Sequence, residues 1–173
     1  MPDEYMFIIV AKPGFGLVGN GDTQAIPTTY WKKTSLLARV QRANKALNYL
    51  TKRVLQTPKP VVCFGYSEGF YVACKLATLN KQITHVSIGG GGGYIDFYDF
   101  VLMNRIAVHK GEQTLKKSQT QLDSTLANFR QIMLKPESTV DFNSGYSYKR
   151  WASFADPPMN NLAKVKILMV HGT

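Results

Sequence analysis

Short apolar runs alternate with longer amphipathic segments along this chain, and this alternation limits the fold more than any other feature of the sequence. Continuous apolar runs of this length are typical of strands that are buried on both faces in a parallel sheet. Helices between such strands imply right-handed crossovers. We therefore expect an α/β fold with a parallel sheet of about four strands and flanking helices. The predicted strands are YMFIIVA (5–11), VVCF (61–64), ITHVSI (83–88) and VKILMV (165–170).

The segments between the predicted strands carry the apolar spacing of helices. Thr34 or Ser35 is placed to cap the first of them. The stretch from Tyr94 to Pro158 is expected to form a helical insertion, or lid, before the last strand. We expect one domain over residues 1–173, with this insertion at 94–158. The predicted helices are Leu36–Gln56, Phe70–Leu79, Tyr94–Val108 and Gln113–Leu134.

Composition excludes several classes of protein. The chain is 45% hydrophobic and 18% charged, which is too apolar for a disordered protein. No run approaches 18 consecutive apolar residues, so we expect no membrane-spanning helix. The net charge of +10 is spread along the chain, and no more than two basic residues are adjacent. Because no nucleic-acid-binding motif accompanies it, this charge indicates a solvated surface and no nucleic-acid partner.

The two cysteines, Cys63 and Cys74, lie among apolar residues. Two cysteines cannot make a disulfide framework or a four-cysteine zinc site. We therefore expect both to be reduced and buried, and we expect no metal site. The N-terminus has no basic region and only a short apolar run, so it is not a signal peptide. Together these features favour a cytoplasmic location.

Residues Gly65-Tyr66-Ser67-Glu68-Gly69 match the pattern G-x-S-x-G, which is weak on its own. Here it follows a predicted strand and opens a predicted helix, which is the context of a nucleophile elbow. Ser67 is then the predicted nucleophile, and the backbone N–H of Glu68 is the predicted oxyanion-hole donor. The Glu68 side chain is expected to point to solvent or to the cleft rim. Both glycines are expected to lack side chains because strand and helix crowd together there. The alternative is a plain glycine-bounded turn.

Five glycines, Gly89 to Gly93, follow the predicted strand 83–88 at the same edge of the sheet. We expect Gly89, Gly90 and Tyr94 to lie beside the nucleophile as binding residues. Glycines there either let a substrate approach the backbone closely or only form a flexible turn. Aromatic residues after the run either line an acyl pocket or cover the sheet, among them Phe97, Tyr98 and Phe100.

With these motifs the chain resembles the α/β-hydrolase fold family, and within it the dienelactone-hydrolase and prolyl-oligopeptidase types. The resemblance is carried by the KPG loop, GYSEG, the glycine run and GYSYKRWASF. It implies that residues 5–16, 61–69, 83–93 and 164–173 contain the fourth to seventh strands of the family. If the first were instead the third strand, the N–H of Phe15 would be a second oxyanion donor. The resemblance implies acyl transfer through Ser67 from a small ester, thioester or amide, without metal or cofactor.

The family orders its triad as serine, then acid, then histidine. The acid normally follows the seventh strand and the histidine follows the eighth. His85 and His171 match neither position. His109 lies between the predicted sixth and seventh strands, where the alternative is a lid histidine that reaches Ser67. Asp96 and Asp99 follow the predicted strand 83–88, where they are better interpreted as helix N-terminal charges. The resemblance therefore implies a serine hydrolase fragment, truncated at both ends, that is inactive alone because the triad acid and histidine are absent. The alternative is a non-catalytic basic interaction module or a non-functional gene remnant.

Overall fold

The computed structural model describes residues 6–15, 27–55, 59–93, 95–109, 115–143, 146–156, 162 and 166–170. Its main sheet is parallel and three-stranded, in the order β1-β2-β5. These strands are β1 (Val61–Tyr66), β2 (Ile83–Gly89) and β5 (Lys166–Val170). The α/β class and the parallel sheet are thus confirmed, with three paired strands among the described residues where we expected about four.

Helices occupy the segments between the strands, close to the predicted bounds. The four longer helices confirm the predictions. Two short helices and a small antiparallel hairpin were not predicted from the sequence. The longer helices are α2 (Leu36–Arg53), α3 (Glu68–Leu79), α4 (Phe97–His109) and α5 (Leu115–Leu134). The additional elements are α1 (Thr28–Lys32), β3 (Asp141–Asn143), β4 (Tyr146–Ser147) and α6 (Tyr148–Ala152).

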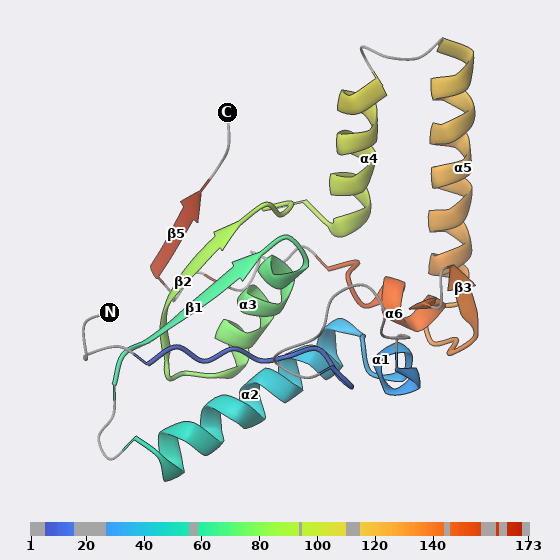
Figure 1. Ribbon diagram of the computed structural model, residues 1–173. Coiled ribbons are helices and arrows are strands. Elements are labelled where there is room, and N and C mark those ends of the chain that lie inside the picture. The colour runs from blue at the N-terminus through green and yellow to red at the C-terminus, as the bar shows by residue number, and fades with distance from the viewer. Residues whose placement is uncertain are drawn as a thin grey trace.

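One face of the sheet carries the core. Helix α3 packs on β1 and β2, and α2 packs on α3 (Figure 1). Helix α2 begins where the Ser35 hydroxyl accepts a hydrogen bond from the Ala38 N–H at 3.3 Å, an N-cap. The core joins α2, α3, β2 and two residues that follow α6. Its members include Val40, Phe70, Tyr71, Cys74, Val86, Ile88, Phe154 and Leu162.

The opposite face of β1 is exposed. Val62, Phe64 and Tyr66 keep 63, 75 and 67% of their surface accessible. Successive strand residues point to opposite faces, so these three share the face turned away from α3. No described element covers them. The expectation that this strand is buried on both faces is therefore wrong for β1.

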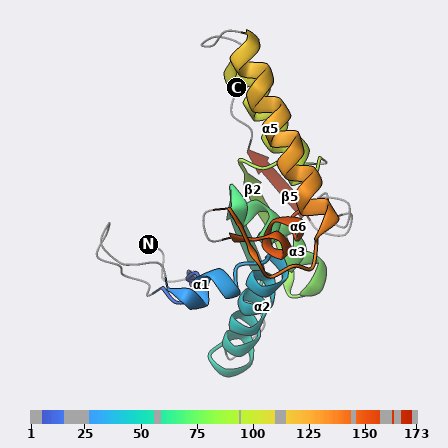
Figure 2. The same cartoon turned by 90° about the vertical axis from the view of Figure 1, so that its right-hand side faces the viewer.

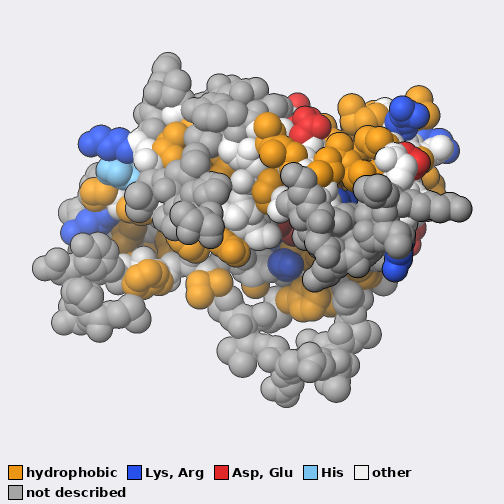
Figure 3. All heavy atoms as spheres, turned by 90° about the horizontal axis from the view of Figure 1, so that it is seen from above, with side chains coloured by type: hydrophobic (Ala, Val, Ile, Leu, Met, Phe, Trp, Pro, Cys, Tyr) orange, Lys and Arg blue, Asp and Glu red, His pale blue; other side chains and the backbone are white. Residues whose placement is uncertain are grey.

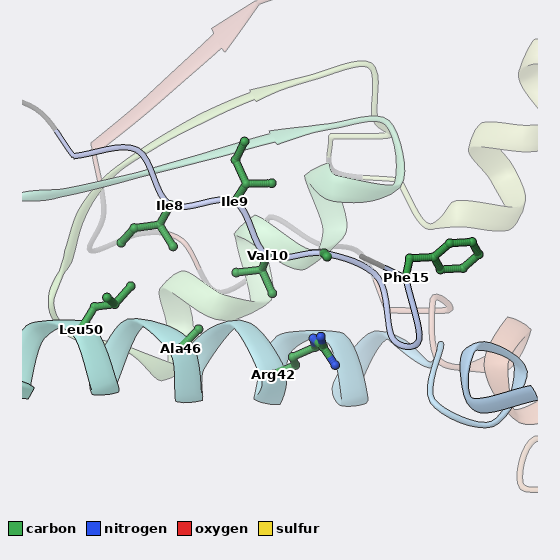
Figure 4. A pocket seen from close by; sticks show the side chains of 8 residues that line it. Ile8, Ile9, Val10, Phe15, Arg42, Ala46 and Leu50 are labelled. Atoms are coloured by element: carbon green, nitrogen blue, oxygen red, sulfur yellow. The ribbon is translucent and has the colours of Figure 1, made fainter. Parts of the chain in front are cut away.

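The N-terminal apolar run was predicted to be a strand, and this is wrong for its described part, Met6–Ala11. The segment is extended but has no sheet partner among the described residues. It lies along α2, with Ile8 and Val10 directed toward the helix and Ile9 directed away (Figure 4). Ile9 is 78% exposed and Ile8 is 40% exposed. The side chains alternate in direction as in a strand, and one set is directed toward α2.

Helices α4 and α5 lie side by side and extend away from the sheet (Figures 1 and 2). The rings of Tyr98 and Phe129 join them, with centroids 4.7 Å apart. The Tyr98 hydroxyl donates to the carbonyl of Trp151 in α6 at 2.8 Å, which ties the base of the helix pair to the core. Seen from above, exposed hydrophobic side chains lie between separate groups of lysines and arginines (Figure 3).

Both cysteines are free thiols. Cys74 is buried, as expected, whereas Cys63 is only half-buried. Burial raises the pKa of Cys63 to about 11 and that of Cys74 to about 12. Both thiols are therefore protonated at neutral pH, which makes them poor nucleophiles.

Candidate active site

Ser67 joins the end of β1 to the start of α3 with φ 53° and ψ −121°. It is the one non-glycine residue in the described part of the chain with a positive φ. Such backbone conformations cost on the order of 1–3 kcal/mol and cluster at functional sites. We call Gly65–Gly69 the serine turn.

Two other serines stand before helices in the ordinary way. Ser35 precedes α2 and Ser147 precedes α6, both with extended backbone, and each accepts a hydrogen bond from its helix. Ser67 makes no such capping bond, and it is exposed. The hydroxyl of Ser67 is thus presented to solvent and is not used to cap the helix that follows it.

Two backbone hydrogen bonds fix the serine turn. The N–H of Ser67 donates to the carbonyl of Gly89 at 3.0 Å, and the N–H of Phe70 donates to the carbonyl of Ser67 at 3.0 Å. The first bond connects the turn to the end of β2. Because β1 and β2 are parallel, their carboxyl ends meet at one edge, which is where open α/β sheets bind ligands.

The two glycines of the turn have different roles. A Cβ on Gly65 would lie 2.3 Å from the carbonyl oxygen of Gly69 and 2.7 Å from Cβ of Ala73. A Cβ on Gly69 would meet nothing within 4 Å. The expectation that both positions exclude side chains is right for Gly65 and wrong for Gly69. The turn needs the space at Gly65 because the backbone of the first turn of α3 occupies it.

The glycine run lies beside the serine turn, where we expected it. Gly90 has φ 65°, and a Cβ there would lie 3.0 Å from the ring of Tyr66. A Cβ on Gly91 would lie 2.3 Å from the ring of Phe70. The absence of a Cβ at Gly90 and Gly91 therefore leaves room for the rings of Tyr66 and Phe70. Our two alternatives, close approach of a substrate or a flexible turn, did not include this role. Tyr94 lies outside the described residues.

Glu68 is the first residue of α3, so its N–H belongs to the turn whose amides have no acceptor within the helix. The expectation that its side chain points to solvent or to the cleft rim is wrong, because the side chain contacts two arginines. One carboxylate oxygen, Oε1, lies 2.6 Å from Nη1 of Arg39 and 2.7 Å from Nη2 of Arg150. Arg39 belongs to α2, and its side chain is only 19% exposed.

Arg150 is buried, with 6% of its surface accessible. Its guanidinium carbon lies 4.3 Å from the ring centroids of Tyr146 and Trp151 and 4.8 Å from that of Phe154. Burial lowers the pKa of Arg150, and the negative charge of Glu68 opposes this shift. A buried cation of this kind depends on its carboxylate partner and on the faces of the rings.

The structure brings no described imidazole to Ser67. His85 pairs with Val62 across the sheet, about 16 Å along the strand from Ser67, and its Nδ1 lies 2.9 Å from the Thr84 hydroxyl. A general base must lie within about 3.2 Å, or one water, of the proton it removes. His109 ends α4, whose far end points away from the sheet (Figure 1). His171 lies outside the described residues.

Asp96 and Asp99, the two aspartates after β2, lie at the N-terminus of α4. Oδ1 of Asp96 accepts a hydrogen bond from the N–H of Asp99 at 2.9 Å, at the start of α4. This is the N-terminal role that the sequence favoured for them. It leaves Asp96 engaged with the backbone.

Sequence reasoning missed Arg39 and Arg150 as neighbours of the serine turn. Arg150 and Glu68 are 82 residues apart in the chain, so no local pattern joins them. One signal was present: an arginine within the aromatic segment 146–154, since arginine commonly stacks on aromatic rings.

Among the described residues, no three His, Cys, Asp or Glu side chains lie together so that they could hold a metal ion. Within the same residues, no helix has the length and apolar character to cross a membrane. An open hollow lies between the N-terminal run and α2, lined by Ile8, Val10, Arg42 and Leu50 among others (Figure 4). None of its lining residues belongs to the serine turn.

Comparison of the chain with protein-family models, with curated proteins and with solved structures finds no match. The function of the chain is therefore inferred from the geometry around Ser67.

Proposed function

We propose that this chain is part of a serine hydrolase of the α/β-hydrolase kind, acting on an ester, thioester or amide through Ser67. One observation carries the proposal: an exposed, uncapped serine held at positive φ between a parallel strand and a helix. The loop at Gly89 and Gly90 lies beside it at the same sheet edge, where a substrate would bind. A fourth strand would complete the core that this family implies.

In this proposal Oγ of Ser67 bonds to the carbonyl carbon, and the carbonyl π electrons move to oxygen. The N–H of Glu68 stabilises that oxyanion. The alcohol, thiol or amine then leaves with the serine proton, and water releases the acyl group from Ser67. The proton passes through a general base that we place outside the described side chains. Without that base the hydroxyl is a weak nucleophile, so we expect residues 1–173 to turn over substrate poorly alone.

The test is labelling by a fluorophosphonate, carried out on the protein as its gene encodes it, with any sequence on either side of residues 1–173. We expect one label per chain, on Ser67, and loss of labelling in Ser67→Ala. Ser124→Ala is the matched control because Ser124 is an exposed serine in the middle of α5. Absence of labelling, or equal labelling of Ser67→Ala, would overturn the proposal.

A second candidate, a non-catalytic interaction module, is favoured by the exposed apolar row on β1. Val62, Phe64 and Tyr66 lie on β1, whose outer edge has no partner strand in the described part of the chain, and such strands associate with other chains.

We expect the chain to self-associate through this row and Phe64→Thr to reduce the association. Threonine suits a strand but removes the exposed ring. Sedimentation velocity measures the shift toward the 19.4 kDa monomer. Tyr49→Thr, which alters another exposed aromatic residue, on α2, is the control. A parent chain that is already monomeric contradicts this prediction.

A further inference from the structure

We infer that Arg39 and Arg150 are positioning residues that hold the serine turn in its strained conformation through the carboxylate of Glu68. The effect on the reactivity of Ser67 rests on the proposed function. The restraint on the turn follows from the contacts alone.

The carboxylate is held from two elements that are distant in the chain. Arg39 belongs to α2 and Arg150 to α6, and both guanidinium groups contact Oε1 of Glu68 at 2.6 and 2.7 Å. Glu68 directly follows Ser67, so the backbone that carries this carboxylate is the backbone of the serine turn. Movement of the turn would break two ion pairs that are largely shielded from water.

Arg150 is itself fixed, which makes it an effective anchor. Three aromatic rings surround its guanidinium group. The backbone of Arg150 is also held: its N–H donates to Oγ of Ser147 at 3.2 Å, and its carbonyl accepts from Oγ of Ser153 at 2.6 Å. A side chain that is already immobilised loses little further freedom when it holds its partner.

A strained backbone persists only where its surroundings over-determine it. The N–H of Ser67 is bonded to Gly89 and the N–H of Phe70 to Ser67. These two amides therefore report directly on the opening of the turn. The two ion pairs of Glu68 add a side-chain restraint to these backbone hydrogen bonds. Glu68 is the first helical residue after Ser67, which has the positive φ.

Arg150→Met is the informative variant. Methionine keeps a long side chain among the three rings, and Glu68 keeps its pair with Arg39, so no buried charge is left alone. Lys149→Met is the matched control. Lys149 is the neighbouring residue and pairs with Glu137 at 2.5 Å, but its side chain is 49% exposed and that of Glu137 is 80% exposed.

The first measurement is amide hydrogen exchange in the full protein. In Arg150→Met we expect exchange at Ser67 and Phe70 to rise on the order of tenfold, with no change at the buried Leu76 of α3. Lys149→Met should leave all three unchanged. Unchanged exchange at Ser67 and Phe70, or an equal rise at all three amides, would overturn the inference, because the latter is general destabilisation.

The second measurement separates this inference from the proposed function. In fluorophosphonate labelling, Arg150→Met should lower the maximal rate about 10- to 100-fold with little change in the concentration for half-maximal rate. Arg150→Lys, which keeps the charge without the planar fork, should recover part of it. An unchanged maximal rate overturns the role in reactivity. If the parent protein does not label, the proposed function falls, and hydrogen exchange still decides whether the restraint exists.

Discussion

Gly65→Ala is expected to lower the free energy of unfolding by about 3 kcal/mol, whereas Gly69→Ala, in the same motif, should raise it by about 0.5 kcal/mol. The added methyl at Gly65 would lie 2.3 Å from a backbone oxygen and 2.7 Å from Cβ of Ala73. Neither neighbour is the end of a flexible side chain, so β1 and α3 must separate. The methyl at Gly69 meets nothing within 4 Å and favours the helix.

Urea denaturation measures both changes, as shifts of the midpoint at constant slope. Because the two substitutions add the same atoms, each controls for the other. Equal effects of the two would show that strand and helix do not crowd at Gly65. Fluorophosphonate labelling of Gly69→Ala should remain close to that of the parent, since Ser67 keeps its conformation.

Glu68→Ala is expected to cost about 3 kcal/mol of unfolding free energy, a large effect for one helix-terminal residue. The substitution leaves Arg150, which is 6% exposed, without a carboxylate and facing Arg39. This loss of unfolding free energy is at the lower end of what breaking a buried ion pair costs, because the Glu68 side chain is 27% exposed.

Glu137→Ala provides the comparison, since it breaks an exposed pair with Lys149 and should change stability by less than about 0.5 kcal/mol. The double variant Glu68→Ala with Arg150→Met should be more stable than Glu68→Ala alone, because the buried cation is removed with its partner. A loss below about 1 kcal/mol in Glu68→Ala, measured by urea denaturation, contradicts the prediction.

The sequence predicted the elements around Ser67 because their signals are local. Apolar runs and glycines mark β1, the serine turn and β2, and the helical spacing after Phe70 marks α3. The parallel pairing of β1 and β2 follows from the crossover between them. In this region the observed bounds differ from the predicted ones by two residues or fewer.

The rest depended on contacts between distant residues. Ile8 and Ile9 have strand-like composition, but a strand also needs a partner strand, and the described N-terminal run lies along α2 instead. Glu68 was assigned to solvent because its two partners come from α2 and α6, and no local pattern indicates them. The exposed face of β1 was not predicted either, since an apolar run does not say which of its faces a helix will cover.

The strand order β1-β2-β5 has a consequence for biosynthesis. β2 is the central strand and pairs with β1 on one edge. Residues 90–165 must be translated before β5 can pair with the other edge of β2. At about 5–20 residues per second, a ribosome needs roughly 4–15 s for that interval. Throughout this time the nascent chain presents an open, parallel-type strand edge on β2, in addition to the apolar row of β1. We therefore expect its yield in cells to depend on chaperones that bind emerging chains, more than on the stability of the finished fold.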